Sequence, residues 1–109
     1  MKLGIIGSGV FGSFLMREIS KVAPEVFTFI GESDTIILAV PSTSYEATAK
    51  KFKGKHLINV CSVQAKTNWI CSKHSTVVTG IHPLFGPRSG SSERTAIVTK
   101  KCEYTPAVV

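Results

Sequence analysis

Six consecutive residues near the N-terminus have the spacing of a phosphate-binding turn. They read GxGxxG and come directly after the apolar run "KLGII": Gly7, Ser8, Gly9, Val10, Phe11 and Gly12. In such a turn the first glycine allows a tight bend, the second lets a pyrophosphate approach the backbone, and the third lets a helix pack closely on a strand. The free amides of the helix N-terminus then face the phosphates. The pattern predicts contacts to a dinucleotide cofactor; the alternative is a glycine-rich turn without a ligand.

A histidine stands in an unusually rigid setting later in the chain. His82 lies in "GIHPLFGPRSG", residues 80–90, which holds two prolines and three glycines. Proline fixes φ and glycine admits conformations closed to other residues, so the loop is either shaped for a purpose or a set of ordinary turns. An imidazole exchanges a proton near neutral pH, which suits proton transfer from a substrate hydroxyl. For a single histidine the alternative is a structural or surface role.

Apolar runs and one amphipathic stripe predict the elements that must position these residues. A strand over residues 2–6 leads into a helix whose apolar stripe runs from Phe11 to Val22, and Pro24 ends that helix. The run "TIILAV", residues 35–40, is apolar on both faces, as in a central parallel strand. A strand–helix–strand unit therefore surrounds the glycine pattern.

The second half of the chain continues this alternation. Thr43 and Glu46 have capping-box spacing for a helix through about Phe52, with Gly54 as its C-terminal stop. The remaining expected elements are strands at 56–63, 75–81 and 95–100 and a short helix at 66–73. Strands that alternate with helices indicate an α/β domain, and we expect a Rossmann-like, doubly wound, mainly parallel sheet.

In a doubly wound sheet the ligand lies outside the carboxyl ends of the strands. This edge should gather the glycine turn, Ser62 and His82, whereas His56 and His74 precede their strands and are expected at the far end. The segment after the strand at 35–40 reaches the same edge. Its predicted cofactor contacts are Val40, Pro41 and Ser42.

A dinucleotide site also predicts an acidic residue for the adenosine ribose, roughly 20 residues after the glycines. Glu32, after "VFTFI", is the candidate. If a second parallel strand ended near Ile30, four residues would remain before the run at 35–40, a reach of roughly 13 Å at about 3.3 Å per residue. This is too short for the usual return path, so the second-strand region is shortened. Residues 26–30 are either an unusually placed strand or part of a compact connector.

Length, charge and cysteine content limit the class of protein. A chain of 109 residues suits one domain, residues 1–109. The net charge of +6 has its densest basic run in "KKFKGK", which falls at a helix end and predicts a solvated surface, with no nucleic-acid partner. No apolar run reaches the roughly 18 residues of a membrane span, so we expect a cytoplasmic protein without a membrane partner. Three cysteines without a CxxC pair predict reduced thiols, two of them in the core, and no metal site.

Four motifs together resemble the prephenate and arogenate dehydrogenases of tyrosine biosynthesis, most of all the arogenate-type plant enzymes. They are "GSGVFGSFL", "DTIILAVP", "NVCSVQAKT" and "GIHPLFGPRSG", and with one gap the resemblance covers residues 1 to about 100. The first two motifs occur in many dehydrogenases, whereas the last two in this order are fairly specific.

The resemblance implies an oxidative decarboxylation with NAD or NADP as hydride acceptor and prephenate or arogenate as the small-molecule substrate. The substrate 4-hydroxyl gives its proton to a histidine, C4 gives a hydride to the cofactor, and carbon dioxide leaves as the ring becomes aromatic. His82 matches the catalytic histidine, and Ser62 matches the serine that binds the histidine and the substrate hydroxyl.

The chain departs from the family pattern at several places. The family reads D-V-x-S-V-K where this chain has Asn59 for the acid and Gln64 for the lysine, which should weaken the local polar network. The family's helical C-terminal domain, which supplies dimer contacts and half of the substrate pocket, is expected to be absent. Two readings follow: a minimal or truncated dehydrogenase, or a non-catalytic dinucleotide-binding module acting with another chain. An uncovered apolar face further predicts a homo-oligomer.

Overall fold

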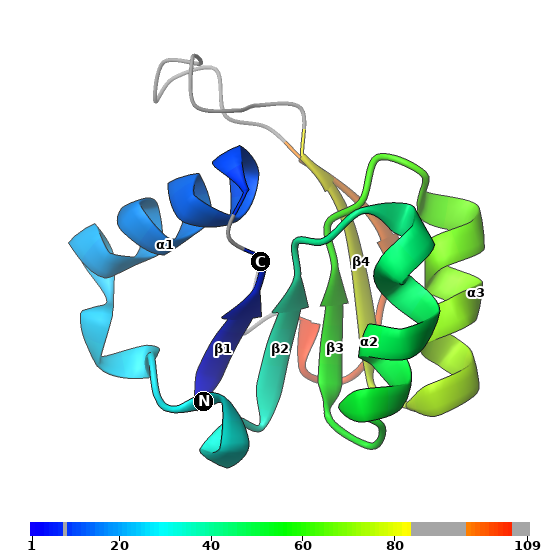
Figure 1. Ribbon diagram of the computed structural model, residues 1–109, viewed down its shortest axis with the longest axis horizontal. Helices are drawn as coiled ribbons and strands as arrows, with labels where there is room; N and C mark the ends of the chain where they lie inside the picture. The colour runs from blue at the N-terminus through cyan, green and yellow to red at the C-terminus, as the bar shows by residue number, and fades with distance from the viewer. Residues whose placement is uncertain (8, 84–95, 106–109) are drawn as a thin grey trace.

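The computed structural model, which describes residues 1–7, 9–83 and 96–105, is an α/β fold built on one five-stranded sheet (Figure 1). The strand order is β1-β2-β3-β4-β5, parallel from β1 to β4, with β5 antiparallel to β4. The expected mainly parallel sheet is therefore confirmed. The strands are β1 (Leu3–Ile6), β2 (Thr35–Leu38), β3 (His56–Asn59), β4 (Val78–Pro83) and β5 (Ala96–Lys100).

In the described part of the chain, three α-helices pack on the two faces of the sheet. They are α1 (Val10–Val22), α2 (Tyr45–Lys51) and α3 (Gln64–His74). Side chains alternate along β2, so Ile36 and Leu38 join the core under α2 and α3, whereas Ile37 joins the core under α1. Two apolar cores, one on each face, therefore hold the sheet between α1 on one side and α2 with α3 on the other.

Tyr45 links the larger core to the end of β2. Its side chain is fully buried, and its hydroxyl donates a hydrogen bond of 2.5 Å to the carbonyl of Leu38, the last residue of β2. Burial raises the pKa of the Tyr45 hydroxyl, so the group stays protonated and remains a donor. This bond ties the first turn of α2 to the carboxyl edge of the sheet.

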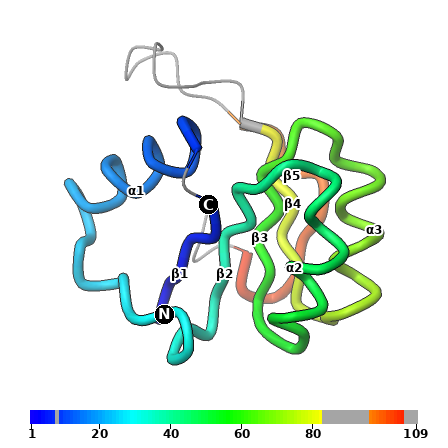
Figure 2. The backbone as a smooth tube through the Cα atoms, viewed as in Figure 1, coloured from blue at the N-terminus to red at the C-terminus, as the bar shows by residue number. Residues whose placement is uncertain are grey.

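The segment between α1 and β2 is a compact connector. It consists of two short 3-10 helices, η1 (Pro24–Val26) and η2 (Ile30–Glu32), and between them Phe27 makes a single parallel bridge with Leu3. Phe27 packs in the core under α1, while Ile30 packs against the core on the opposite face. The chain therefore touches the outer side of β1 and then passes its N-terminal end to reach β2 (Figure 2). Of the two alternatives for residues 26–30, the connector is the one observed.

Two sequence expectations were wrong. The capping box of Thr43 and Glu46 does not form, because a 3-10 turn (η3, Ser42–Ser44) follows Pro41 and α2 begins only at Tyr45, with Ser44 at its N-cap and no side-chain cap bond. Glu46 instead pairs with Lys73 at 2.9 Å and His74 at 3.0 Å. One cysteine, Cys71, is buried, whereas Cys61 and Cys102 are only partly buried.

The C-terminal stop of α2 is confirmed, since Gly54 has a φ of 83°, which favours glycine. Within the described ranges, no helix is both long and apolar enough to cross a membrane.

Candidate functional site

A cleft of about 440 Å³ lies at the carboxyl edge of the parallel strands. Four segments that are far apart in the sequence meet there because parallel strands end at the same edge of a sheet. Residues on the rim come from α1, from the segments that follow β2 and β3, and from β4: Phe11, Val40, Pro41, Ser42, Cys61, Ser62 and His82. The structure thus brings half of the twelve residues predicted for a site to the rim of one cleft.

The three glycines of the turn between β1 and α1 have different structural roles. Gly7 has a φ of 123°, and a Cβ there would lie 2.1 Å from the carbonyl oxygen of Ala39. A Cβ on Gly12 would lie 2.4 Å from the carbonyl oxygen of Gly7. Gly9 has an ordinary φ of −70°, and a Cβ there would meet nothing within 4 Å. The fold therefore requires glycine at the first and third positions but not at the second.

The rest of the turn prepares the N-terminus of α1. Gly9 is the N-cap, and its carbonyl accepts the first helical hydrogen bond, 3.0 Å from the amide of Ser13. Val10 is 75% exposed, and Phe11 lines the cleft. Ser8, predicted as a cofactor contact, lies outside the described residues. The helix has no acidic side chain in its first turn, so its N-terminal dipole stays available for an anion.

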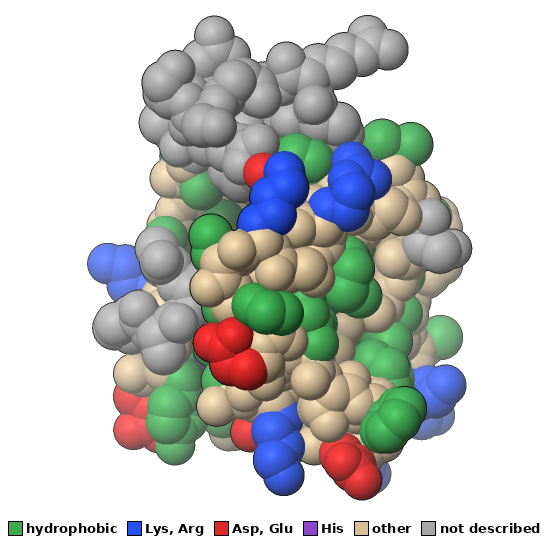
Figure 3. Space-filling view, turned by 90° about the vertical axis from the view of Figure 1, so that its left-hand side faces the viewer, with side chains coloured by type: hydrophobic (Ala, Val, Ile, Leu, Met, Phe, Trp, Pro, Cys, Tyr) green, Lys and Arg blue, Asp and Glu red, His purple; other side chains and the backbone are tan. Residues whose placement is uncertain are grey.

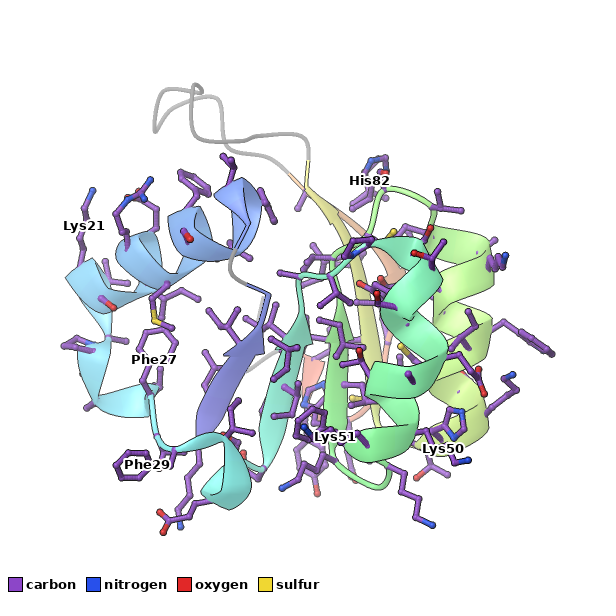
Figure 4. All side chains as sticks on the ribbon, in the orientation of Figure 1. Lys21, Phe27, Phe29, Lys50, Lys51 and His82 are labelled. Carbon is purple, nitrogen blue, oxygen red and sulfur yellow. The ribbon has the colours of Figure 1, made fainter. Side chains whose placement is uncertain are left out.

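The predicted catalytic pair, Ser62 and His82, lines one cleft. Ser62 is exposed in the segment between β3 and α3. His82 is half-buried in β4, where it pairs with Ile97 of β5, and it lies at the upper edge of the sheet (Figure 4). A strand thus holds the backbone of His82; residues 84–90 of the same motif lie outside the described part of the chain.

A network of neutral side chains supports this end of the sheet. The buried Asn59 amide donates to Thr67 at 2.7 Å and to Asn68 at 2.8 Å, and its oxygen accepts the amide of Cys61 at 3.0 Å. Asn68 in turn donates to Thr99 of β5 at 2.9 Å. An amide both donates and accepts, so Asn59 satisfies the buried neighbours without a charge.

Gln64 completes the network on the side of the cleft. Its amide nitrogen donates to the carbonyls of Cys61 and Ile81, the latter at 3.0 Å, and its oxygen accepts from Thr99. These two carbonyls belong to the residues just before Ser62 and His82. Asn59 and Gln64 thus belong to one local polar network made of neutral amides, and the expectation that they weaken it relative to the family pattern stays a prediction.

Glu32, predicted for the ribose, does not reach the cleft. It lies in η2, just before β2 begins, and β2 starts level with Leu3 at the amino end of β1. The glycine turn follows the opposite end of β1. Because the connector turns back at the amino end, the sheet separates Glu32 from the other predicted cofactor contacts, and we leave it out of the site.

The basic run at the end of α2 also lies away from the cleft. Lys50 and Lys51 form the last turn of α2, and Lys51 lies over the Phe52 ring, 5.5 Å from its centroid (Figure 4). The next lysine of the run, Lys53, is exposed, and the amine of Lys55 donates to the carbonyl of Ser33 near the amino end of β2. These lysines therefore do not supply a local cationic wall to the cleft.

Neither a protein-family model nor a curated protein matches the chain. The positions of the side chains are therefore the basis for assigning roles at this site. Reasoning from the sequence missed the bridging role of Gln64. Its position two residues after Ser62, at a junction of strand and helix, was the available signal.

Replacing Gln64 with leucine should lower the free energy of unfolding by about 1–3 kcal/mol, because the carbonyls of Cys61 and Ile81 and the hydroxyl of Thr99 lose their partner. Urea unfolding followed by circular dichroism measures the effect. Lys66→Leu, an exposed position in the first turns of the same helix, is the control and should change stability little. Equal midpoints for the two variants would contradict a supporting role for Gln64.

Proposed function

We propose that the cleft binds NAD or NADP in a Rossmann-like, doubly wound fold, with the pyrophosphate at the N-terminus of α1. The observation that carries the proposal is Gly9. The φ of −70° at this position is open to residues other than glycine, and no atom of the described residues beyond its chain neighbours lies within 4 Å of where a Cβ would be, yet the residue is glycine. A glycine without a structural requirement, above a cleft and at a helix N-terminus, leaves room for a phosphate to approach the backbone.

The second part of the proposal is the oxidative decarboxylation of prephenate or arogenate. When bound, NAD(P)⁺ supplies the hydride acceptor for this reaction. His82 takes the proton of the substrate hydroxyl, and Ser62 holds that hydroxyl and the imidazole in place. The two side chains line the same cleft as the glycine turn's Phe11, which supports this assignment of roles. Gln64 is a positioning residue, because it fixes the backbone just before each of them.

A non-catalytic dinucleotide-binding module acting with another chain is the second candidate. Ser62 is exposed, and Val63, which lines the same cleft, is 52% exposed. Catalysis needs reactive atoms held to within about an ångström, which an open cleft does not ensure. In this alternative the cleft binds the cofactor, and the partner chain covers the exposed side of the cleft.

Self-association belongs to the same proposal, and a second copy of the chain is the partner. From Gly4 to Ile6, β1 pairs with no described strand on the side away from β2. Phe29, which follows the segment that bridges to Leu3 on this side, is 83% exposed, and Val22, the last residue of α1, is 82% exposed. Figure 3 shows this face, with hydrophobic side chains exposed among charged ones. An open strand edge beside exposed apolar side chains favours pairing with another copy.

Gly9→Val should weaken NAD⁺ or NADP⁺ binding by at least about tenfold, roughly 1.4 kcal/mol, while the chain stays folded, because the new side chain fills space in front of the turn. Isothermal titration with each cofactor measures the change. Gly31→Val is the matched control, since a Cβ there also meets nothing within 4 Å and the residue lies in η2. Unchanged affinity in a folded Gly9→Val variant would sink the pyrophosphate proposal.

His82→Asn should lower kcat by roughly 10² to 10⁴ and leave cofactor affinity nearly unchanged, because His82 acts on the substrate and not on the phosphates. Ser62→Ala should act in the same direction but less steeply. The assay follows cofactor reduction with prephenate and with arogenate. Cofactor binding without turnover of either substrate by the unaltered chain would favour the non-catalytic module, and loss of cofactor binding in His82→Asn would assign the histidine a structural role.

Sedimentation velocity at micromolar concentration should show a dimer or larger species. Phe29→Lys should shift the distribution toward the monomer, because it places a charge in the exposed apolar region beside β1. Trp69→Lys, which removes an exposed aromatic side chain from α3, is the control and should leave the distribution unchanged. A clean monomer for the unaltered chain would rule out this contact.

A further inference from the structure

The cleft extends from the glycine turn in one direction only. Its described lining residues come from α1, from the ends of β2 and β4, and from the segments that follow β2 and β3. None of these described residues belongs to the connector between α1 and β2, although the connector borders the outer side of β1. β1 is the outermost strand of the sheet (Figure 1). The cleft therefore lies over β2, β3 and β4, away from the outer side of β1.

Hydrogen bonds hold the connector at the amino end of β1. The amide of Thr28 donates to the carbonyl of Leu3 at 3.2 Å, and the amide of Asp34 donates to the carbonyl of Lys2 at 2.9 Å. Leu3 begins β1 and Ile6 ends it, so these contacts lie about 10 Å from the carboxyl end of the strand at the usual rise per residue. The connector thus passes β1 at the end opposite the glycine turn.

Side-chain packing fixes the connector in the same place. A Cβ on Gly4 would lie 2.5 Å from Cδ1 of Ile30 and 2.7 Å from Oγ of Ser33, so these two side chains pack directly on the backbone of β1. Ser33 is buried, and its hydroxyl donates to the carbonyl of Phe29 at 3.2 Å. Glu32 lies between these packed residues. Its backbone is therefore held at the amino end of the sheet.

A doubly wound fold binds a dinucleotide with two mononucleotide-binding halves, one on each side of the glycine strand. On one side of β1 the described sheet adds the parallel strands β2, β3 and β4, and on the other side it adds only the bridge between Leu3 and Phe27. The complete side carries Ser62 and His82, which face the nicotinamide in the function proposed above. The adenosine half of the cofactor would then extend over the outer side of β1, where no described strand end supplies a contact.

The described lining of the cleft also lacks a group that would distinguish NAD from NADP. The two cofactors differ by one phosphate on the adenosine ribose, which an acidic side chain disfavours and an arginine accommodates. Among the described lining residues there is no acidic residue, no lysine and no arginine. Glu32, the acid predicted for this role, lies at the other end of β1.

We propose that the cleft recognises the pyrophosphate and the nicotinamide half of its cofactor and makes no selective contact with the adenosine half. The inference rests on the function proposed above and specifies which part of the dinucleotide is bound. The contacts by which a full fold selects between the two cofactors are those to the adenosine ribose. The chain therefore accepts NAD and NADP with similar affinity, and nicotinamide mononucleotide is a ligand in its own right.

Nicotinamide mononucleotide and adenosine 5′-monophosphate are matched probes, because each is one half of NAD and carries a single phosphate. In isothermal titration of the full chain, nicotinamide mononucleotide should bind about tenfold more tightly than adenosine 5′-monophosphate, and the Kd values of NAD⁺ and NADP⁺ should agree within about fivefold. Equal or tighter binding of adenosine 5′-monophosphate, or a larger preference for one dinucleotide, would overturn the inference and leave cofactor binding intact. Binding of none of the four ligands would remove the proposed function and the inference with it.

Glu32→Gln tests the position of the predicted ribose ligand directly. Because the connector holds Glu32 at the amino end of β1, the substitution should change the affinities for NAD⁺ and NADP⁺ by less than about twofold. Glu25→Gln is the matched control, since both glutamates are exposed and lie in the short 3-10 helices of the connector. A larger loss of NAD⁺ affinity in Glu32→Gln than in Glu25→Gln, with NADP⁺ affinity kept, would place the carboxylate at the ribose and contradict the inference.

Discussion

The close approach of three backbone segments at the carboxyl ends of β1 and β2 is the constraint on which the cleft depends. The amide of Ala39 donates to the carbonyl of Ile6 at 2.8 Å, and the carbonyls of Ala39 and Gly7 occupy the space that a Cβ would need on Gly7 and Gly12. Only glycine fits at these two positions, so the turn can bend and α1 can begin directly above the sheet. The position of the N-terminus of α1 beside the cleft is a consequence of these close approaches.

Uncharged side chains stabilise the side of the cleft that is formed by the segment after β3 and by the end of β4. Asn59 and Gln64 each satisfy several backbone and side-chain groups, and together they connect β3, α3, β4 and β5. Burying a carboxylate and an ammonium would cost desolvation energy that the two amides do not incur. The neutral network therefore holds the backbone before Ser62 and His82 at low cost in free energy.

The two ends of the sheet have different chemistry for the same physical reason. Parallel strands bring their carboxyl ends to one edge and their amino ends to the other, and each edge collects side chains from distant parts of the sequence. One edge holds the glycine turn and the candidate catalytic pair. The other holds the Cys102 thiol, which lies near the buried hydroxyls of Thr79 and Thr105 and the imidazole of His56. Side chains from distant parts of the sequence thus meet at each edge, and the two groups lie at opposite ends of the strands.

Local sequence patterns by themselves determined the elements and the edge where the cleft lies. The apolar stripe from Phe11 to Val22, the apolar run at 35–40 and the glycine spacing depend only on neighbouring residues, and the structure has α1, β2 and the turn in these places. The predicted start of α2 was wrong. The 3-10 turn after Pro41 determines where the helix begins, whereas the spacing of Thr43 and Glu46 does not.

Tertiary structure alone decided the features that depend on where distant segments meet. The position of Glu32 follows from the path of the connector past the end of β1. The bridging role of Gln64 requires β4 and β5 beside α3, and the partners of Cys102 come from β3 and β4. Periodicity reports which face of an element is apolar, but hydrogen bonds between side chains far apart in the sequence exist only once the sheet has been assembled.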